Sequence, residues 1–146
     1  MAETITHSVE ETVAFGRRLS AGVDAGTIFA LDGDLGAGKT QLARGLAQGA
    51  GYDGRVQSPS YGLINIYEGG RLTVFHLDLY RLESPDEIIG AGLEEYLIEP
   101  AGIVAVEWAS RWFDRPNAET HSHLQRLRLE TISENERRII HEPGRT

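Results

Sequence analysis

The spacing of apolar residues changes twice within the first fifty positions. Residues 8–11, Ser-Val-Glu-Glu, have the spacing of a capping box, and the apolar positions that follow predict a helix from about Val9 to Ser20. The continuous apolar run from Thr27 to Leu31 is typical of a buried strand. Between Lys39 and Gly51 apolar residues recur three and four positions apart, which predicts a second helix. The predicted order is helix, strand, helix.

Strands and turns dominate the remainder of the chain. The hydrophobic pattern predicts strands at Leu63–Glu68 and Leu72–Tyr80, joined by the hairpin signal Gly69-Gly70. A second capping box, with proline in its favoured first helical position, opens a short helix from Ser84 toward Gly90. Further strands are predicted at Ile103–Val106, Leu124–Glu130 and Arg137–His141. These elements indicate a mixed parallel and antiparallel sheet with helices.

Length and composition indicate one globular domain spanning residues 1–146. Hydrophobic residues make up 40% and charged residues 25%, as in ordinary globular proteins. No apolar run approaches the roughly 18 residues that cross a bilayer, and the N-terminus lacks signal-peptide features, so a cytoplasmic protein is expected. The absence of cysteine excludes disulfides, thiolate zinc sites and cysteine nucleophiles.

The charge balance argues against direct binding to nucleic acid. The chain carries 14 basic and 22 acidic side chains, a formal net charge of -8 at pH 7. Contacts with a phosphate backbone need a basic face, which this balance does not favour. A role near RNA is therefore expected to run through a partner, and direct binding to DNA or a membrane is not expected.

The segment between the first predicted strand and the second helix contains the chain's single lysine. It fits the phosphate-loop pattern G-x-x-x-x-G-K-[ST] in the required strand–loop–helix context. Its glycines allow successive N–H groups to point at an anion, the lysine supplies a compact charge to the outer phosphates, and the threonine offers a hydroxyl to Mg²⁺. The eight residues are Gly33, Asp34, Leu35, Gly36, Ala37, Gly38, Lys39 and Thr40.

A nucleoside triphosphate with Mg²⁺ needs a second anchor, which in such proteins is usually an acid at the end of another buried strand. Glu107 follows the predicted strand Ile103–Val106 directly and is the first candidate, although an ordinary exposed carboxylate has the same pattern. Asp78 is a rival, because it alternates with His76 and Tyr80 on one face of its strand. That polar face either orients water or a metal, or is the wet side of a half-buried strand.

Two further segments allow a functional and a structural interpretation. The loop Ser58-Pro59-Ser60 follows the phosphate-loop helix, where a switch segment with hydroxyl groups could sense a third phosphate; alternatively it is a surface turn. The aromatic residues Trp108, Trp112 and Phe113 could form a patch for a partner, although aromatic residues near a strand end more often belong to the core.

The motifs GDLGAGKT, SPSYGLINIY, FHLDLYRL and VAVEW, in this order and at these spacings, resemble the small bacterial ATPase family TsaE of the tRNA threonylcarbamoyladenosine pathway. The resemblance covers nearly all of Ser8 to Trp108. It implies a P-loop NTPase-like three-layer α/β fold and an ATPase that uses ATP and Mg²⁺. It also implies work with TsaB and TsaD, the pair that transfers threonylcarbamoyl to the adenosine beside the anticodon, whose turnover ATP hydrolysis supports.

The resemblance also implies roles for individual residues. Gly33 through Thr40 would hold the triphosphate, Thr40 and Glu107 would hold magnesium, and Asp78 with the loop 58–61 would line the hydrolytic side, so that Lys39, Asp78 and Glu107 are the catalytic candidates. The family contacts adenine near its N-terminus and its C-terminal strands, which indicates Ser8 and Arg138. Two positions depart from the family pattern: Ser60 stands where S-P-T is usual, and Ala109-Ser110 follow Trp108 where a proline, or a serine with a following acid, is usual.

Other classes of phosphate-loop protein share the loop. A small metabolite kinase would normally need an arginine-bearing lid and an acceptor pocket, for which 146 residues leave little chain. A binding module whose ATP state matters without turnover is another alternative. A GTPase is disfavoured, because the single lysine at position 39 leaves none for an N-K-x-D guanine signature. If the chain is an ATPase, it is expected to be slow without a partner that excludes water from the site.

Overall fold

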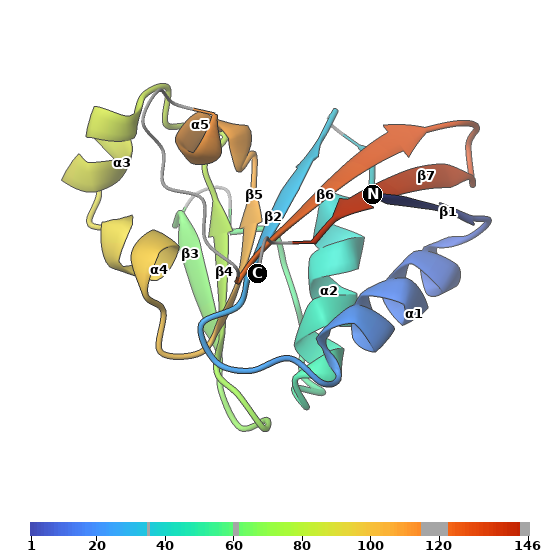
Figure 1. Ribbon diagram of the computed structural model, residues 1–146, viewed down its shortest axis with the longest axis horizontal. Helices are drawn as coiled ribbons and strands as arrows, with labels where there is room; N and C mark the ends of the chain where they lie inside the picture. The colour runs from blue at the N-terminus through green and yellow to red at the C-terminus, as the bar shows by residue number, and fades with distance from the viewer. Residues whose placement is uncertain (35, 60–61, 115–122, 144–146) are drawn as a thin grey trace.

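One seven-stranded sheet organises the chain (Figure 1). The computed structural model describes residues 1–34, 36–59, 62–114 and 123–143. The strands lie side by side in the order β1-β7-β6-β2-β5-β4-β3. Their bounds are β1 Ala2–Thr6, β2 Ile28–Gly33, β3 Ile64–Tyr67, β4 Val74–Asp78, β5 Ile103–Glu107, β6 Leu124–Thr131 and β7 Arg137–Glu142.

Helices cover both faces of the sheet and give the fold three layers. Figure 1 shows the longer helices α1 and α2 on one side of the sheet, and the short helices α3, α4 and α5 on the other. The helices are α1 Val9–Ser20, α2 Lys39–Gly49, α3 Pro85–Gly90, α4 Glu94–Ile98 and α5 Ser110–Phe113. Among the described residues, no helix has the length and apolar character needed to cross a membrane.

Strand direction brings several strand ends to one edge of the sheet. β6, β2, β5 and β4 run parallel, whereas β1, β7 and β3 pair antiparallel at the margins. The carboxyl ends of β2, β4 and β5 therefore lie together, which is where open α/β sheets bind their ligands. The mixed sheet and the three-layer α/β architecture confirm the fold predicted from the sequence.

Alternation along the central strands builds a core on each face. In β2, Phe29 and Leu31 pack in the cluster that includes the apolar residues of α2, whereas Ile28 and Ala30 pack in the cluster beneath α3 to α5. These side chains are at most 1% exposed. A strand buried on both faces reads as a continuous apolar run, which is why β2 was recognisable from sequence.

Most of the predicted elements are present, with small differences at their ends. The first helix has the predicted bounds, and the Ser8 hydroxyl accepts a hydrogen bond from the Glu11 amide as the capping box requires. Three elements were not predicted: β1, α4 and α5. β1 is a mostly exposed edge strand with one buried residue, and the two helices have only five and four residues, so none carries a strong periodic pattern.

The aromatic residues after β5 divide between the core and the site. Trp112 and Phe113 are 4% and 9% exposed and pack from α5 into the core, so the core interpretation of these two residues is confirmed. Trp108 is only partly buried and lies at the end of β5. It packs against the edge of the same cluster and also borders the cavity beside Lys39.

Candidate nucleotide site

The phosphate loop joins the carboxyl end of β2 to the first turn of α2. Gly36 and Gly38 have φ angles of 79° and 99°, which side chains with a Cβ rarely adopt. At Gly33 a Cβ atom would lie 2.6 Å from the carbonyl oxygen of Leu129 in β6. The glycines of the motif are thus needed for the shape of the loop and for its contact with the sheet.

Lys39 lies at the centre of this loop. Its side chain is 5% exposed, and its ammonium group donates to the carbonyl oxygens of Gly33 at 2.5 Å and Asp34 at 2.8 Å. The same nitrogen lies 4.4 Å from the ring centre of Trp108, within reach of a cation–π contact. Trp108 has a left-handed backbone with φ 58°, an unusual conformation for a bulky residue that is frequent at functional sites.

Burial and charge act on Lys39 in opposite directions. Burial lowers the pKa of its ammonium group below 10.5, and the negative charges of Glu107, Asp78, Asp32 and Asp34 partly oppose that shift. A buried cation is costly unless it is paired, so the loop favours an anion that would approach the ammonium group.

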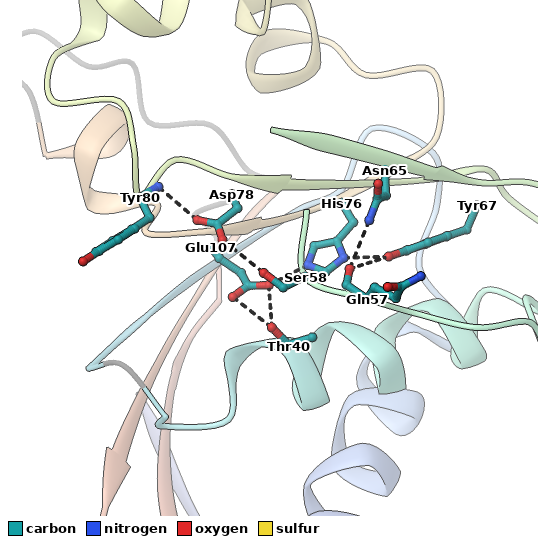
Figure 2. Close-up of polar contacts among 9 residues, drawn as sticks. All are labelled: Thr40, Gln57, Ser58, Asn65, Tyr67, His76, Asp78, Tyr80 and Glu107. Atoms are coloured by element: carbon teal, nitrogen blue, oxygen red, sulfur yellow. Dashed lines mark hydrogen bonds and ion pairs between the residues drawn. The ribbon is translucent and has the colours of Figure 1, made fainter. Parts of the chain in front are cut away.

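Thr40 and Glu107 form the pair on which a metal site would depend. The Thr40 hydroxyl donates to the Glu107 carboxylate, with separations of 3.0 Å to Oε2 and 3.3 Å to Oε1 (Figure 2). Glu107 is 4% exposed and ends β5, so the alternative of an ordinary exposed carboxylate does not apply. Oxygen ligands of this kind suit Mg²⁺, which typically takes one or two protein groups and completes its shell with phosphate and water. Within the described ranges, no group of three or more His, Asp or Glu side chains is arranged to hold a metal ion.

Asp78 lies beside Glu107. The two residues are partners in the parallel ladder of β4 and β5, and Asp78 is 4% exposed. Its Oδ1 accepts from the Tyr80 amide at 2.9 Å, and its Oδ2 lies 3.4 Å from the Ser58 hydroxyl (Figure 2). His76 and Asp78 are buried, so they are not the wet side of a half-buried strand, whereas Tyr80, beyond the end of β4, is 43% exposed.

Two further side chains, for which the sequence predicted no specific role, contact Glu107 directly or through one another. His76, which is fully buried in β4, contacts Glu107 through Nε2 at 2.6 Å. Its Nδ1 lies 2.8 Å from the hydroxyl of Tyr67 in β3 (Figure 2). A histidine two positions before the candidate aspartate was a usable signal. Tyr67 reaches the site through the register of β3 against β4, which the predicted hairpin alone does not fix.

Two of the cavities that border the phosphate loop bear on the candidate site. The larger one, about 310 Å³, is bordered by Lys39, Thr40, Ser58, Asp78, Tyr80, Glu107 and Trp108. The smaller one, about 160 Å³, lies between the start of α1 and the β6–β7 turn, with Ser8, Thr12, Asn135 and Arg137 on its walls. Gly36, Gly38 and Gln41 border both cavities. The loop therefore borders one cavity lined by the carboxylates Asp78 and Glu107 and a second cavity lined by hydroxyl groups and Arg137.

Arg138 is the predicted site residue that the structure does not bring to the loop. Its guanidinium group lies 3.3 Å from Glu130 of β6. Because side chains alternate along a strand, its neighbour Arg137 points the other way and donates to the carbonyl oxygens of Ala37 and Gly36 at 3.2 and 3.3 Å. The predicted site residues Leu35 and Ser60 lie outside the described residues.

A glycine loop between a central parallel strand and a helix, with a carboxylate from the neighbouring strand facing its threonine, defines an α/β protein of the P-loop class. The family model described as "Threonylcarbamoyl adenosine biosynthesis protein TsaE" matches residues 6–140. The chain belongs to the TsaE family.

Individual relatives agree with this assignment. The chain is 45% identical over 112 residues to the tRNA threonylcarbamoyladenosine biosynthesis protein TsaE of Nostoc sp., covering 74% of this chain and 68% of the relative. It is 41% identical over 104 residues to the protein of that name from Bacillus subtilis, covering 71% and 64%. The matched segments thus span about two thirds of these relatives' length.

A solved structure shares the fold. The crystal structure of Bacillus subtilis YdiB superposes with a TM-score of 0.76 at 29% sequence identity, covering 98% of this chain and 86% of YdiB. The similarity therefore extends beyond the phosphate loop to nearly the whole described architecture.

Proposed function

We propose that the chain is a magnesium-dependent ATPase that acts in the threonylcarbamoylation of tRNA. Membership of the TsaE family supports the pathway. The observation that carries the ATPase assignment is the buried pair of Thr40 and Glu107 next to the Lys39 ammonium group. An ammonium group and two oxygen-bearing side chains of the kind that bind Mg²⁺ border one cavity, which supports a site for an outer phosphate with its metal.

The triphosphate would lie along the loop from Gly33 to Thr40. Backbone N–H groups at the start of α2 would donate to its oxygens, and Lys39 would exchange its contacts with loop carbonyls for the outer phosphates. Mg²⁺, held by Thr40 and Glu107, would neutralise charge on the phosphates when bound. The protein's own contribution is to hold these groups in place before the nucleotide arrives.

The hydrolytic side of the cavity would be formed by Asp78 and the loop 58–61. Ser58 lies against the Asp78 carboxylate, and both border the cavity that contains Lys39 and Glu107. These contacts support a role for Asp78 in accepting a hydrogen bond from an attacking water and for the Ser58 hydroxyl in sensing the third phosphate; Ser60, the other candidate of this loop, lies outside the described residues.

The nucleoside end would occupy the smaller cavity. It borders the opposite side of the same loop, and its walls come from the first turn of α1 and the β6–β7 turn. Ser8 remains a candidate contact there, and Arg137 takes the place of the predicted Arg138 because its guanidinium group already lies on the loop.

We also propose TsaB- and TsaD-like partners in the cytoplasm, with tRNA reached only through that complex. The net charge of -8 supports indirect contact with RNA. The proposed test measures phosphate release from ATP by the chain alone and with a purified TsaB–TsaD pair. Slow release alone and faster release with the pair are expected. Equal rates would contradict the partner dependence, and transfer of labelled phosphate to a metabolite would favour the kinase alternative.

A further inference from the structure

Behind the Thr40–Glu107 pair lies a chain of buried hydrogen bonds (Figure 2). It runs from the Glu107 carboxylate to His76 at 2.6 Å and from His76 to the Tyr67 hydroxyl at 2.8 Å. The exposed fractions of these three side chains are 4%, 0% and 6%. Buried polar groups are costly unless each has a partner, so this chain fixes the geometry of its members.

The direction of the hydrogen bonds follows from the number of hydrogens available. A carboxylate oxygen only accepts, so the separation of 2.6 Å to Glu107 is met by a hydrogen on Nε2 of His76. Tyr67 has one hydroxyl hydrogen, which goes either to Nδ1 of His76 or to the Gln57 carbonyl oxygen at 3.2 Å. In both cases Nε2–H donates to Glu107, whatever the charge on the ring.

The series of hydrogen bonds from Glu107 through His76 to Tyr67 continues to the loop that carries Ser58. The Gln57 carbonyl oxygen is contacted by the Tyr67 hydroxyl and by the Asn65 side-chain amide at 3.1 Å. Gln57 directly precedes Ser58, whose hydroxyl lies at Asp78. The same tyrosine therefore contacts both the histidine that holds Glu107 and the backbone that presents Ser58.

We propose that His76 and Tyr67 are positioning residues that aim the Glu107 carboxylate at the metal and couple metal binding to the conformation of the segment Val56–Ser58. This inference rests on the proposed role of Glu107 as a magnesium ligand. Partners that orient a ligating group commonly change metal affinity by about 10- to 100-fold. His76 supplies the orienting hydrogen, and Tyr67 holds the ring in the plane that delivers it.

The test is the magnesium dependence of nucleotide binding rather than of turnover. Calorimetry with ADP, in Mg²⁺ and in EDTA, gives for each variant the affinity in Mg²⁺ divided by the affinity in EDTA. His76→Gln places an amide donor near the former Nε2, whereas His76→Asn retains only a group near the former Nδ1. Tyr67→Phe removes one hydroxyl, and Tyr52→Phe is its control, because Tyr52 stacks on Tyr67 at 4.8 Å while its own hydroxyl donates to Arg55 instead.

We expect the ratio to fall about tenfold or more in His76→Asn, to recover in His76→Gln and to fall severalfold in Tyr67→Phe, with the EDTA affinity and the Tyr52→Phe ratio unchanged. If His76→Asn does not fold, as judged by circular dichroism, Tyr67→Phe decides the result. An unaltered ratio in the folded variants overturns the inference. A wild-type chain whose ADP affinity does not depend on Mg²⁺ would instead overturn the proposed function and this inference with it.

The coupling to the loop has a separate readout. Hydrogen exchange of the amides of Val56–Ser58 is measured with ADP in the presence and absence of Mg²⁺. We expect metal to slow exchange in the wild type and in Tyr52→Phe, and to have at most half that effect in Tyr67→Phe. The same slowing in Tyr67→Phe as in the wild type would show that the tyrosine does not transmit metal binding to the loop.

Discussion

At the scale of single residues, the site depends on charges that the fold buries before any ligand binds. Lys39, Asp78 and Glu107 are each at most 5% exposed, and they face one cavity from three elements. The site holds one basic and two acidic side chains, and burial lowers the pKa of Lys39 while the charges of Glu107 and Asp78 partly oppose that shift. Replacing a single member therefore affects the site more than the loss of one contact would.

The first prediction concerns Glu107. Glu107→Gln retains the size of the side chain but removes the charge that would hold Mg²⁺, so phosphate release should fall by about 100-fold or more, while nucleotide affinity in EDTA stays within about twofold. Phosphate release and calorimetry on one preparation measure both effects. Glu99→Gln makes the same chemical change at an exposed position and serves as the control. Retained release in Glu107→Gln would exclude the proposed role.

The second prediction concerns pH. Burial lowers the pKa of Lys39 in the free protein, and a bound phosphate would raise it again, so between these two values nucleotide binding takes up a proton. Affinity should therefore decrease as pH rises through the pKa of the free protein. Calorimetry at alkaline pH in buffers of different ionisation enthalpy measures the uptake. Binding without proton uptake across this range would contradict a direct contact between phosphate and Lys39.

At the scale of elements, the close packing of α1 on α2 positions the helix that carries Lys39 and Thr40. A Cβ atom on Gly45 of α2 would overlap the Val13 carbonyl oxygen of α1. We predict that Gly45→Ala destabilises the fold, because overpacking costs about 1–3 kcal/mol, against a gain of about 1 kcal/mol in helix propensity. Backbone atoms cannot rotate away as a side chain can, so we expect a net loss of about 2 kcal/mol.

Urea unfolding measures this loss, and α3 offers a matched control. Gly90 also lies in a helix, but a Cβ atom there meets nothing within 4 Å. Gly90→Ala should be neutral or stabilising by up to about 1 kcal/mol. Equal stability changes in the two variants would show that the contact between α1 and α2 does not depend on a small residue at position 45.

The elements that local patterns specify were predictable from the sequence, and the side-chain contacts that depend on strand register and facing were not. The phosphate loop, Glu107 and Asp78 follow from motif and position along the chain, and all of their described members meet at one edge of the sheet. The His76–Tyr67 contact depends on the register of β3 against β4, and the exchange of Arg138 for Arg137 depends on which face of β7 meets the loop. A shift of one residue along a strand moves a side chain to the other face of the sheet, and so reverses which residue reaches the site.

At the scale of the whole molecule, the sheet order explains why distant segments form one site. β5 lies between β2 and β4. Glu107, at the end of β5, therefore has the phosphate loop after β2 on one side and Asp78 of β4 on the other. The antiparallel hairpin of β6 and β7 brings Arg137 back to the same loop from the opposite direction. The walls of the two cavities described at the loop therefore come from parallel and antiparallel strands as well as from the motif.

The central claim is that the lone lysine in this loop binds the phosphates of a nucleotide, and calorimetric titration with Mg²⁺ and a non-hydrolysable ATP analogue tests it most directly. Lys39→Ala should weaken binding at least about tenfold, since a hydrogen bond to a charged group contributes roughly 1.5–3 kcal/mol. Arg18→Ala, which removes the same charge from α1, should leave affinity unchanged. Undiminished affinity in a folded Lys39→Ala variant would contradict the account.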